Sequence, residues 1–312
     1  MRKPAIRSLS VAAVGLALLA SSAAAQQNGV NHVSDGGFES GMVSLSLPAT
    51  TRFPVFSGGW ASRGRRSPEI QATGSFAGVR SLRLETRPED PIALIQDLPL
   101  DGAAYGLRFA FFIESGSQTV RLLGDWDRGS PADGTPAFEA RLSTAGIHLA
   151  TPGGTWRVET EISPLEWHSL DVVADPRRGT QDVRIDGRPV VSLPGVPFVR
   201  RSTLVIGGGA ADDGVFRYDA IVVTSLVDLE LAAITDAVAA VDIPFREAVL
   251  RRLAAARAAL DRGSPTLALP ELGVARNMLG LGTSGSVTQS ARQAISDLMA
   301  LIEATGRLRP AR

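Results

Sequence analysis

The sequence predicts a mainly β protein, in which two antiparallel sheets pack as a jelly-roll sandwich and a small helical bundle domain follows at the C-terminal end. Short runs that alternate apolar and polar residues fill the region from 28 to 225, and Gly, Pro and Asp separate them. After residue 226, Ala, Leu and Arg dominate and apolar residues recur at three- and four-residue steps. A period of two is typical of strands with two unlike faces, and the longer period is typical of helices. We therefore predict a β-sandwich at 28–225 and a helical domain at 226–312.

The first 25 residues have the three parts of a secretory signal peptide. Arg2, Lys3 and Arg7 are basic, residues 9–20 are apolar, and Ala23–Ala25 offers a small-residue cleavage site. The apolar part is shorter than the roughly 20 residues that a membrane span needs. The sequence therefore predicts a secreted or periplasmic protein without a membrane span.

Composition excludes several kinds of chemistry. The 312 residues include 32 basic and 32 acidic side chains, so the excess of positive charge that nucleic-acid binding requires is absent. The chain has no Cys, which excludes disulfides and thiol chemistry. Lys3 is the only lysine and lies in the predicted signal peptide, which excludes a lysine general base or Schiff base in the mature chain.

The first half of the β domain is predicted to open with a strand at Val33–Glu39, followed by a loop and Trp60. Residues 74–85 read as a turn of small residues leading into a strand with Leu82 and Leu84 facing inward. The alternation predicts further strands at 91–98, 105–113, 119–123, 137–143, 146–149 and 156–161.

The second half contains the clearest turn signals. A strand is predicted at 167–174, and the next, at 182–185, runs directly into Asp186-Gly187. Asp-Gly between two strands favours a tight hairpin, because Gly accepts the positive φ that the turn demands. Two more strands are predicted at 203–206, which ends in three glycines, and at 216–223.

The order of Trp167, Asp186-Gly187, Ile206-Gly207 and the strand Phe216–Val222 resembles the closing half of concanavalin-A-like and laminin-G-like jelly rolls. Val33–Glu39 resembles the opening strand of many secreted carbohydrate-binding modules. Such domains include lectins, carbohydrate-binding modules, glycosidases, polysaccharide lyases and adhesive receptor modules, so the resemblance does not choose among these functions.

The same resemblance implies a structural calcium ion that ties the opening strand to the closing strand. The matching positions are Glu39 and Asp219, and Asp35 and backbone carbonyls would complete the roughly six to eight oxygen ligands that calcium takes. The alternative is that Asp219 faces solvent or pairs with an arginine.

Sequence signatures of catalysis are missing. The chain lacks the Glu-x-Asp-x-(x)-Glu strand of concanavalin-A-like glycosidases, and it lacks the Gln-x-His and Tyr-Lys-rich strands of the alginate-lyase branch. The three histidines show no zinc-ligand spacing. His168 shares a face with Leu170 and Val172, which favours a buried, hydrogen-bonded position over catalysis.

A sugar-binding surface combines aromatic rings with planar polar groups. Trp126 is the leading aromatic candidate, because Asp125 and Asp127 flank it just after a predicted strand. The residues predicted to share its face are Arg121, Glu139, Arg141 and Trp156. The alternative places Trp60, Trp156 and Trp167 in the core and makes Glu139 and Arg141 a solvated ion pair. A further cluster, Arg63, Arg65 and Arg66, would meet an acidic polysaccharide or simply be solvated.

Four helices are predicted in the C-terminal domain. Residues 226–241 are amphipathic, Asp242 and Pro244 fit the start of the second helix, and Gly263 ends that helix. The third, at 264–279, is expected to be short or kinked at Pro270, and the fourth starts at Thr288. The sequences Ala258–Gly263 and Gly285–Thr288 resemble FIMAH-type helical domains of secreted bacterial proteins; a plain helical bundle explains them equally well.

These observations favour a secreted, non-catalytic binding protein that recognises carbohydrate or an extracellular or cell-surface partner through the β-sandwich. Two alternatives stay open, a polysaccharide-degrading glycosidase or lyase of the same fold and a structural envelope protein.

Overall fold

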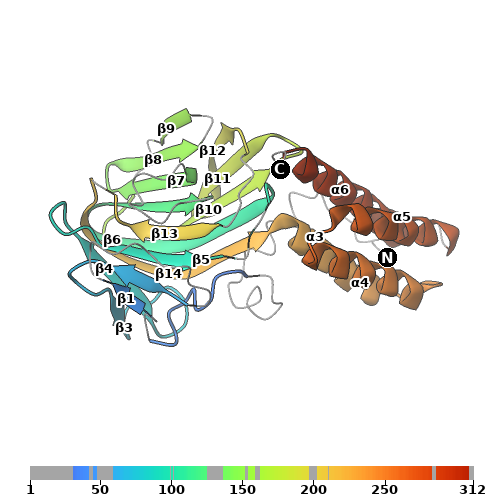
Figure 1. Ribbon diagram of the computed structural model, residues 1–312, viewed down its shortest axis with the longest axis horizontal. Coiled ribbons are helices and arrows are strands. Elements are labelled where there is room, and N and C mark those ends of the chain that lie inside the picture. The colour runs from blue at the N-terminus through green and yellow to red at the C-terminus, as the bar shows by residue number, and fades with distance from the viewer. Residues whose placement is uncertain are drawn as a thin grey trace, which may run out of the picture. The chain divides into compact units, whose positions relative to one another are not determined.

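The computed structural model describes residues 31–41, 45–47, 59–98, 100, 102–124, 136–151, 154–158, 162–196, 202–209, 211–282 and 286–308. Within these residues the chain divides into two compact units, Asn31–Thr224 and Ser225–Arg307. The first unit is a mostly antiparallel β-sandwich, in which 45–47 and 61–63 form a parallel pair, and the second is helical (Figure 1), as the two periodicities of the sequence predict.

The described part of the first unit contains fourteen strands. Their bounds are β1 Leu45–Leu47, β2 Ala61–Arg63, β3 Glu69–Gln71, β4 Ser81–Thr86, β5 Ala93–Asp97, β6 Tyr105–Leu123, β7 Pro136–Ser143, β8 Gly146–Thr151, β9 Gly154–Val158, β10 Trp167–Asp175, β11 Thr180–Ile185, β12 Arg188–Pro194, β13 Thr203–Gly207 and β14 Asp213–Ser225.

One long strand, β6, joins the two layers of the sandwich. Residues 105–112 of β6 pair with β10, whereas residues 117–123 pair with β7 and 120–123 with β13. The β10 side continues through β11 and β12, and β14 pairs with β6 and β4. The β13 side continues through β5 and β2, and the β7 side through β8 and β9 (Figure 1).

The passage of β6 from one layer to the other accounts for an error in the sequence prediction. Two separate strands are predicted at 105–113 and 119–123, but β6 is continuous. Gly116 lies between them with φ +72°, and a Cβ there would meet the Asp213 carbonyl oxygen at 1.8 Å. In the sequence, Gly116 suggests the end of a strand. In the structure it lets β6 lie close against β14, because it has no Cβ.

The main core of the sandwich confirms the predicted alternation. Leu82 and Leu84 are fully buried, and so are the inward-facing residues of β6 and β10. The core also holds polar side chains that are hydrogen-bonded internally. The Gln118 amide nitrogen donates to the Leu84 carbonyl at 2.8 Å, and the Gln118 amide oxygen accepts from the Tyr218 hydroxyl at 3.1 Å. Such pairing removes most of the cost of burying an amide.

The Asp-Gly hairpin forms as predicted. Asp186 and Gly187 both have positive φ, +50° and +73°, which is the conformation of a type I′ turn. The turn joins β11 to β12, and Ile185 pairs directly with Arg188.

The predicted opening strand at Val33–Glu39 is wrong, because this segment is a series of turns. Asp35 and Phe38 have positive φ, and the Phe38 amide donates to the Asp35 carbonyl at 3.0 Å. The Asp35 carboxylate accepts from the backbone amide of Ser40, so a side chain replaces the hydrogen bonds that a strand partner would give. Phe38 still packs in the core, stacked on Trp60 with ring centroids 5.4 Å apart.

The described part of the second unit contains α3 Leu226–Ala239, α4 Arg246–Asp261, α5 Pro265–Gly282 and α6 Ser286–Leu308. The predicted Asp242 cap is wrong, since α4 begins after Phe245, which has φ +63° and no side-chain capping bond. The third helix is not short, because it continues through Pro270 to Gly282. Gly263, with φ +66°, ends α4 as predicted, and the fourth helix starts two residues before Thr288. Among the described residues, no helix is both long and apolar enough to cross a membrane.

Candidate functional site

The predicted sugar-binding residues lie partly in the described structure. Asp125, Trp126 and Asp127 fall outside the described residues, and so does the side chain of Trp156. Arg121 on β6 pairs directly with Glu139 on β7. Because cross-strand partners project from the same side of a sheet, Arg121 and Glu139 share a face, while the part of the prediction that concerns Trp126 and Trp156 stays a prediction.

We call Thr119, Arg121, Glu139 and Arg141 the Arg121 face. Thr119 pairs with Arg141 in the row next to Arg121 and Glu139. The neighbouring residues Phe138, Ala140 and Leu142 point the other way and are fully buried in the main core. The predicted division of β7 into an apolar inner face and a polar outer face is therefore confirmed.

Arg121 is the least exposed charged residue of this face. It is 7% exposed, and its Nε donates to Glu139 Oε2 at 2.6 Å. Its Nη1 atom is also buried but makes no hydrogen bond within the described part of the chain. A buried donor without an acceptor is costly, because it has lost its hydrogen bonds to water. An incoming acceptor at this position would satisfy it.

Arg141 is tied to the loop that follows β13. Its Nη2 donates to the Ser117 hydroxyl at 3.0 Å and to the Ala211 carbonyl at 2.9 Å. The same loop is fastened to β6 by Asp212, which accepts from the Thr119 hydroxyl at 2.6 Å. These bonds fix the polar groups at this end of the face.

An apolar cluster adjoins the Arg121 face on the same side of the sheet. Val205 on β13 pairs with Arg121, and Ile95 on β5 pairs with Val205. The cluster consists of Ala61, Ala93, Ile95, Leu123 and Val205. All five side chains are buried, so this cluster is a small second core beside the Arg121 face and not an exposed surface.

Glu39 and Asp219, the predicted calcium ligands, both bind one turn, residues 75–80. Asp219 Oδ2 accepts from the Phe76 and Ala77 amides at 2.8 Å each. Glu39 Oε1 accepts from the Val79 amide at 2.9 Å and from the Arg80 amide at 3.1 Å. The two carboxylates are therefore brought to the same turn, whereas the resemblance implies that a calcium ion links them.

The environment of these two carboxylates differs from that of a calcium site. The pKa of Asp219 is raised to about 6, because burial and, to a lesser extent, the nearby Glu39 charge outweigh three backbone hydrogen bonds that lower it. Asp35 binds Ser40 instead of joining the pair. No group of three or more His, Cys, Asp or Glu side chains suited to a metal occurs among the described residues. The oxygens that would bind calcium here accept backbone amides, so these residues fit the anchoring of the turn better than an ion, and calcium stays a prediction.

His168 occupies the buried, hydrogen-bonded position that the sequence predicts. Its Nδ1 lies 2.8 Å from Asp186 Oδ2, and its Nε2 lies 3.0 Å from the Ser163 carbonyl oxygen. The ring links β10 to the β11–β12 hairpin and is no part of the Arg121 face.

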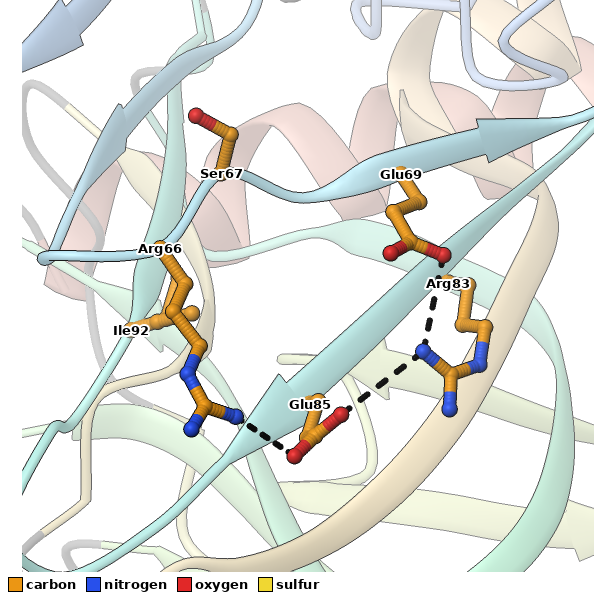
Figure 2. A pocket seen from close by; sticks show the side chains of 6 residues that line it. All are labelled: Arg66, Ser67, Glu69, Arg83, Glu85 and Ile92. Atoms are coloured by element: carbon orange, nitrogen blue, oxygen red, sulfur yellow. Dashed lines mark hydrogen bonds and ion pairs between the residues drawn. The ribbon is translucent and has the colours of Figure 1, made fainter.

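A pocket of about 320 Å³ lies on the β3–β4 side of the unit. Figure 2 shows its side chains, Arg66, Ser67, Glu69, Arg83, Glu85 and Ile92. Arg66 Nη1 lies 2.5 Å from Glu85 Oε1, and Arg83 Nη1 lies 3.5 Å from Glu69 Oε2 and 3.8 Å from Glu85 Oε2. Guanidinium and carboxylate groups therefore alternate around the pocket.

A line of contacts connects this pocket to three aromatic rings. Arg83 and Arg217 both bind Glu114, with distances of 3.3 Å and 2.7 Å to its two carboxylate oxygens. The Arg217 guanidinium lies 5.0 Å from the centre of the Phe112 ring. Phe112 contacts Trp167, with ring centroids 5.6 Å apart, and Trp167 contacts Phe76 at 5.9 Å.

The placement of Trp167 corrects the expectation that it is a core residue. Trp60 is buried, but Trp167 is partly exposed on the outer side of β10, where it pairs with Phe112. The alternation of β10 contained this signal, because His168, Leu170 and Val172 fill the inner positions. Phe76 lies on the turn that Asp219 and Glu39 hold, and sequence alone gives no sign that this turn meets Trp167.

The arginine cluster of the sequence is only partly a cluster in space. Arg66 lines the pocket, while the backbone amide of Arg65 donates to Asp90 at 3.1 Å. Because Arg66 already pairs with Glu85, this loop is not an unpaired cationic patch. The alternating Arg83 and Glu85 on β4 were the sequence signal for the ion pairs.

Glu85 is the carboxylate of the pocket that the most arginines contact. Hydrogen bonds from Arg87 and Arg66 lower the pKa of Glu85, so this carboxyl is ionised at neutral pH. A glycosidase needs one carboxyl that stays protonated to donate to the leaving group. Glu85 lacks that property.

No known family model matches the chain, and no curated protein matches it in sequence. Among solved structures, the chain is similar to a sialidase (13% identity, TM-score 0.39), and the similarity covers 62% of this chain and 21% of the sialidase chain. It is similar to a carbohydrate-binding module, CBM66, from Bacillus subtilis (13% identity, TM-score 0.35, 57% of this chain and 99% of that one). It is also similar to the Emp47p carbohydrate recognition domain (12% identity, TM-score 0.36, 57% and 94%). Likeness at this level does not assign a ligand, so a functional conclusion depends on the residues of this chain.

Proposed function

We propose that this protein is a secreted, non-catalytic glycan-binding protein and that the Arg121 face of its β-sandwich is the binding surface. The observation that carries this proposal is the buried Nη1 atom of Arg121, which makes no hydrogen bond within the described residues. A sugar hydroxyl is a suitable acceptor for it, because a hydroxyl also donates and can reach the adjacent Glu139 carboxylate.

The geometry of Arg121 and Glu139 supports a sugar diol as the bound group. The two side chains are hydrogen-bonded at 2.6 Å and project side by side from paired strands. Neighbouring hydroxyls of a pyranose ring can accept from one group and donate to the other. Sugars also present C–H faces, for which the predicted Trp126 ring would offer contact surface.

The same geometry argues against the enzymatic alternative at this face. Glu139 is a partly exposed carboxylate. The nearest other carboxylate tied to the face, Asp212, is buried and accepts from the Gly209 amide at 2.8 Å in addition to Thr119. Hydrolysis of a glycosidic bond by this fold requires two carboxyl groups that both reach the substrate. Within the described residues the Arg121 face offers one.

A glycan array tests the proposal with the full mature chain and its variants. We expect Arg121→Leu and Glu139→Gln each to lower glycan binding about tenfold or more, because each leaves the other polar group without its partner. Trp126→Ala is expected to lower binding as well. Arg178→Ala is the matched control, since Arg178 is an exposed arginine paired with Asp182 on the same unit.

Two results would contradict the proposal. The first is the absence of binding to any glycan by the wild-type chain, which would favour an extracellular protein partner or a structural role. The second is equal binding by wild type, Arg121→Leu and Glu139→Gln. Repeating the array with and without calcium tests the predicted ion, because calcium held by Glu39 and Asp219 would make binding or stability depend on it.

A further inference from the structure

The pocket of Figure 2 and the aromatic rings beyond it form a continuous surface on the other layer of the sandwich. Glu69, Arg83 and Arg217 lie in one row across β3, β4 and β14. Arg83 and Arg217 are directly paired like charges, which would repel each other. Glu114 on β6 separates them by binding one guanidinium with each carboxylate oxygen.

The charges of this surface cancel. Among the described residues, the ion pairs of this surface join four guanidinium groups to four carboxylates, and each of these guanidinium groups has a carboxylate within 4 Å. The cations are Arg66, Arg83, Arg87 and Arg217, and the anions are Glu69, Glu85, Asp90 and Glu114. An anionic polymer would have to displace carboxylates that already hold the arginines. A neutral ligand has no such competitor.

The guanidinium and carboxylate groups of this surface can nevertheless form further hydrogen bonds. A guanidinium group has five N–H donors. The ion pairs of Arg83 use its Nε and Nη1 atoms, and both dashed lines that reach Arg83 in Figure 2 end on the same nitrogen. Each carboxylate also has several lone pairs. Groups that donate and accept at once, such as sugar hydroxyls, can use both kinds of site.

The aromatic end supplies the apolar part of the surface. Phe76 is 42% exposed and Trp167 is partly exposed. The indole nitrogen of Trp167 donates to the Gly74 carbonyl at 3.1 Å, which fixes the orientation of the ring. A fixed, partly exposed ring beside planar polar groups suits the C–H face of a pyranose.

We propose that this surface is a second binding site, separate from the Arg121 face, and that it takes a neutral oligosaccharide. It runs across β3, β4, β14, β6 and β10. With strands about 4.8 Å apart, the five strands span about 19 Å, which is the length of several sugar residues and not of one. The ligand is therefore a chain lying across the strands, with one end in the pocket and the other at the rings.

Affinity electrophoresis of the full mature chain tests this site. The probes are the neutral polysaccharides xylan, arabinan, galactan and mixed-linkage β-glucan, and the acidic polysaccharide polygalacturonate. Phe76→Ala removes an exposed ring, and Arg83→Ala removes the guanidinium that joins three carboxylates. Val79→Ala is the matched control, because Val79 is an exposed apolar residue of the same turn. Circular dichroism melting shows whether each variant is folded.

We expect at least one neutral polysaccharide to retard the wild-type chain. Phe76→Ala and Arg83→Ala should weaken that interaction about fivefold to tenfold, and Val79→Ala should leave it unchanged. The second site is excluded if no neutral polysaccharide retards the chain or if polygalacturonate binds more tightly than all of them. A third outcome also excludes it: Phe76→Ala, which removes no ion pair, binds like wild type, and Arg121→Leu loses binding. All glycan binding would then belong to the Arg121 face.

Discussion

Asp219 shows how a single residue links the folding of the sandwich to the shape of its surface. It is fully buried, and its two carboxylate oxygens accept three backbone amides, those of Phe76, Ala77 and Ala220. The turn that it holds carries Phe76 to Trp167. Asp219 has no salt-bridge partner among the described residues. Its buried carboxyl group serves to fix this turn through the backbone hydrogen bonds.

Burial of Asp219 makes stability depend on pH in a defined direction. Its pKa is about 6 in the folded protein, against about 3.9 in an unfolded chain. Between these values the folded state keeps a proton that the unfolded state has lost, so the free energy of unfolding falls as pH rises from 4 to 6. Asp219→Asn removes this titration. We expect the stability of wild type relative to Asp219→Asn to decrease by of order 1 kcal/mol between pH 4 and pH 7.

Urea unfolding of both proteins at several pH values measures this difference, because other titrating groups cancel between them. A difference that stays constant, or that grows as pH rises, would show that the Asp219 carboxyl is not held in the protonated form that its burial favours.

At the scale of elements, turns and bends were harder to predict than strands. The alternation of β4, β7 and β10 is visible in sequence because each strand has one apolar and one polar face, and Asp186-Gly187 carries its own turn signal. In the sequence, a glycine such as Gly116 suggests the end of a strand, but Gly116 lies inside β6. Whether such a glycine ends a strand depends on β14, which is about 100 residues away in sequence. The turn at Asp35 was not predicted either. There the Asp35 carboxylate accepts the backbone amide of Ser40, a hydrogen bond that a neighbouring strand would otherwise provide.

Two glycines with nearly the same φ differ in their surroundings. They allow the energetic cost of a positive φ to be measured apart from the cost of a steric clash. Gly116 and Gly187 have φ +72° and +73°, but a Cβ at Gly116 would meet Asp213 O at 1.8 Å, whereas a Cβ at Gly187 has nothing within 4 Å. Gly187→Ala is expected to cost about 1 kcal/mol, the price of a left-handed conformation with a Cβ. Gly116→Ala should cost about 3 kcal/mol or more, because backbone atoms of β14 must move as well.

Chemical denaturation of the two variants gives both values directly. Equal destabilisation would mean that β6 and β14 separate easily at Gly116, so that β6 is not held tightly between the two layers.

At the scale of the whole molecule, the architecture was predictable and the surfaces were only partly so. The fold class could be predicted from local sequence patterns. These are the alternation of the strands and the change in periodicity near residue 226. The shared face of Arg121 and Glu139 followed from alternation, but the ion pair between them was not predicted, since the alternative interpretation paired Glu139 with Arg141. The second surface was not predictable, because it assembles β3, β4, β14, β6 and β10, and the neighbours of β14 in space are remote in sequence.

The described residues also predict how the molecule unfolds. The core of the sandwich and the core of the helices have no residue in common. Ser225 ends β14 and caps α3 by accepting from the Asp228 amide at 3.4 Å, so the chain passes from one unit to the other at a single residue. Units with separate cores are expected to fold separately. We expect fragment 26–224 to keep a cooperative β-type unfolding transition and fragment 225–312 to keep its helical circular dichroism.

Calorimetry of the full chain and both fragments provides the measurement, and the helical fragment tests the role of the cap. A fragment that begins at Leu226 lacks the Ser225 hydroxyl and should be less stable than fragment 225–312 by about 1 kcal/mol. If the full chain shows one transition and fragment 225–312 has no helical signal, the helices depend on the sandwich for their stability. The expectation that the two units fold separately would then be wrong, and every binding variant would have to be compared in the full chain.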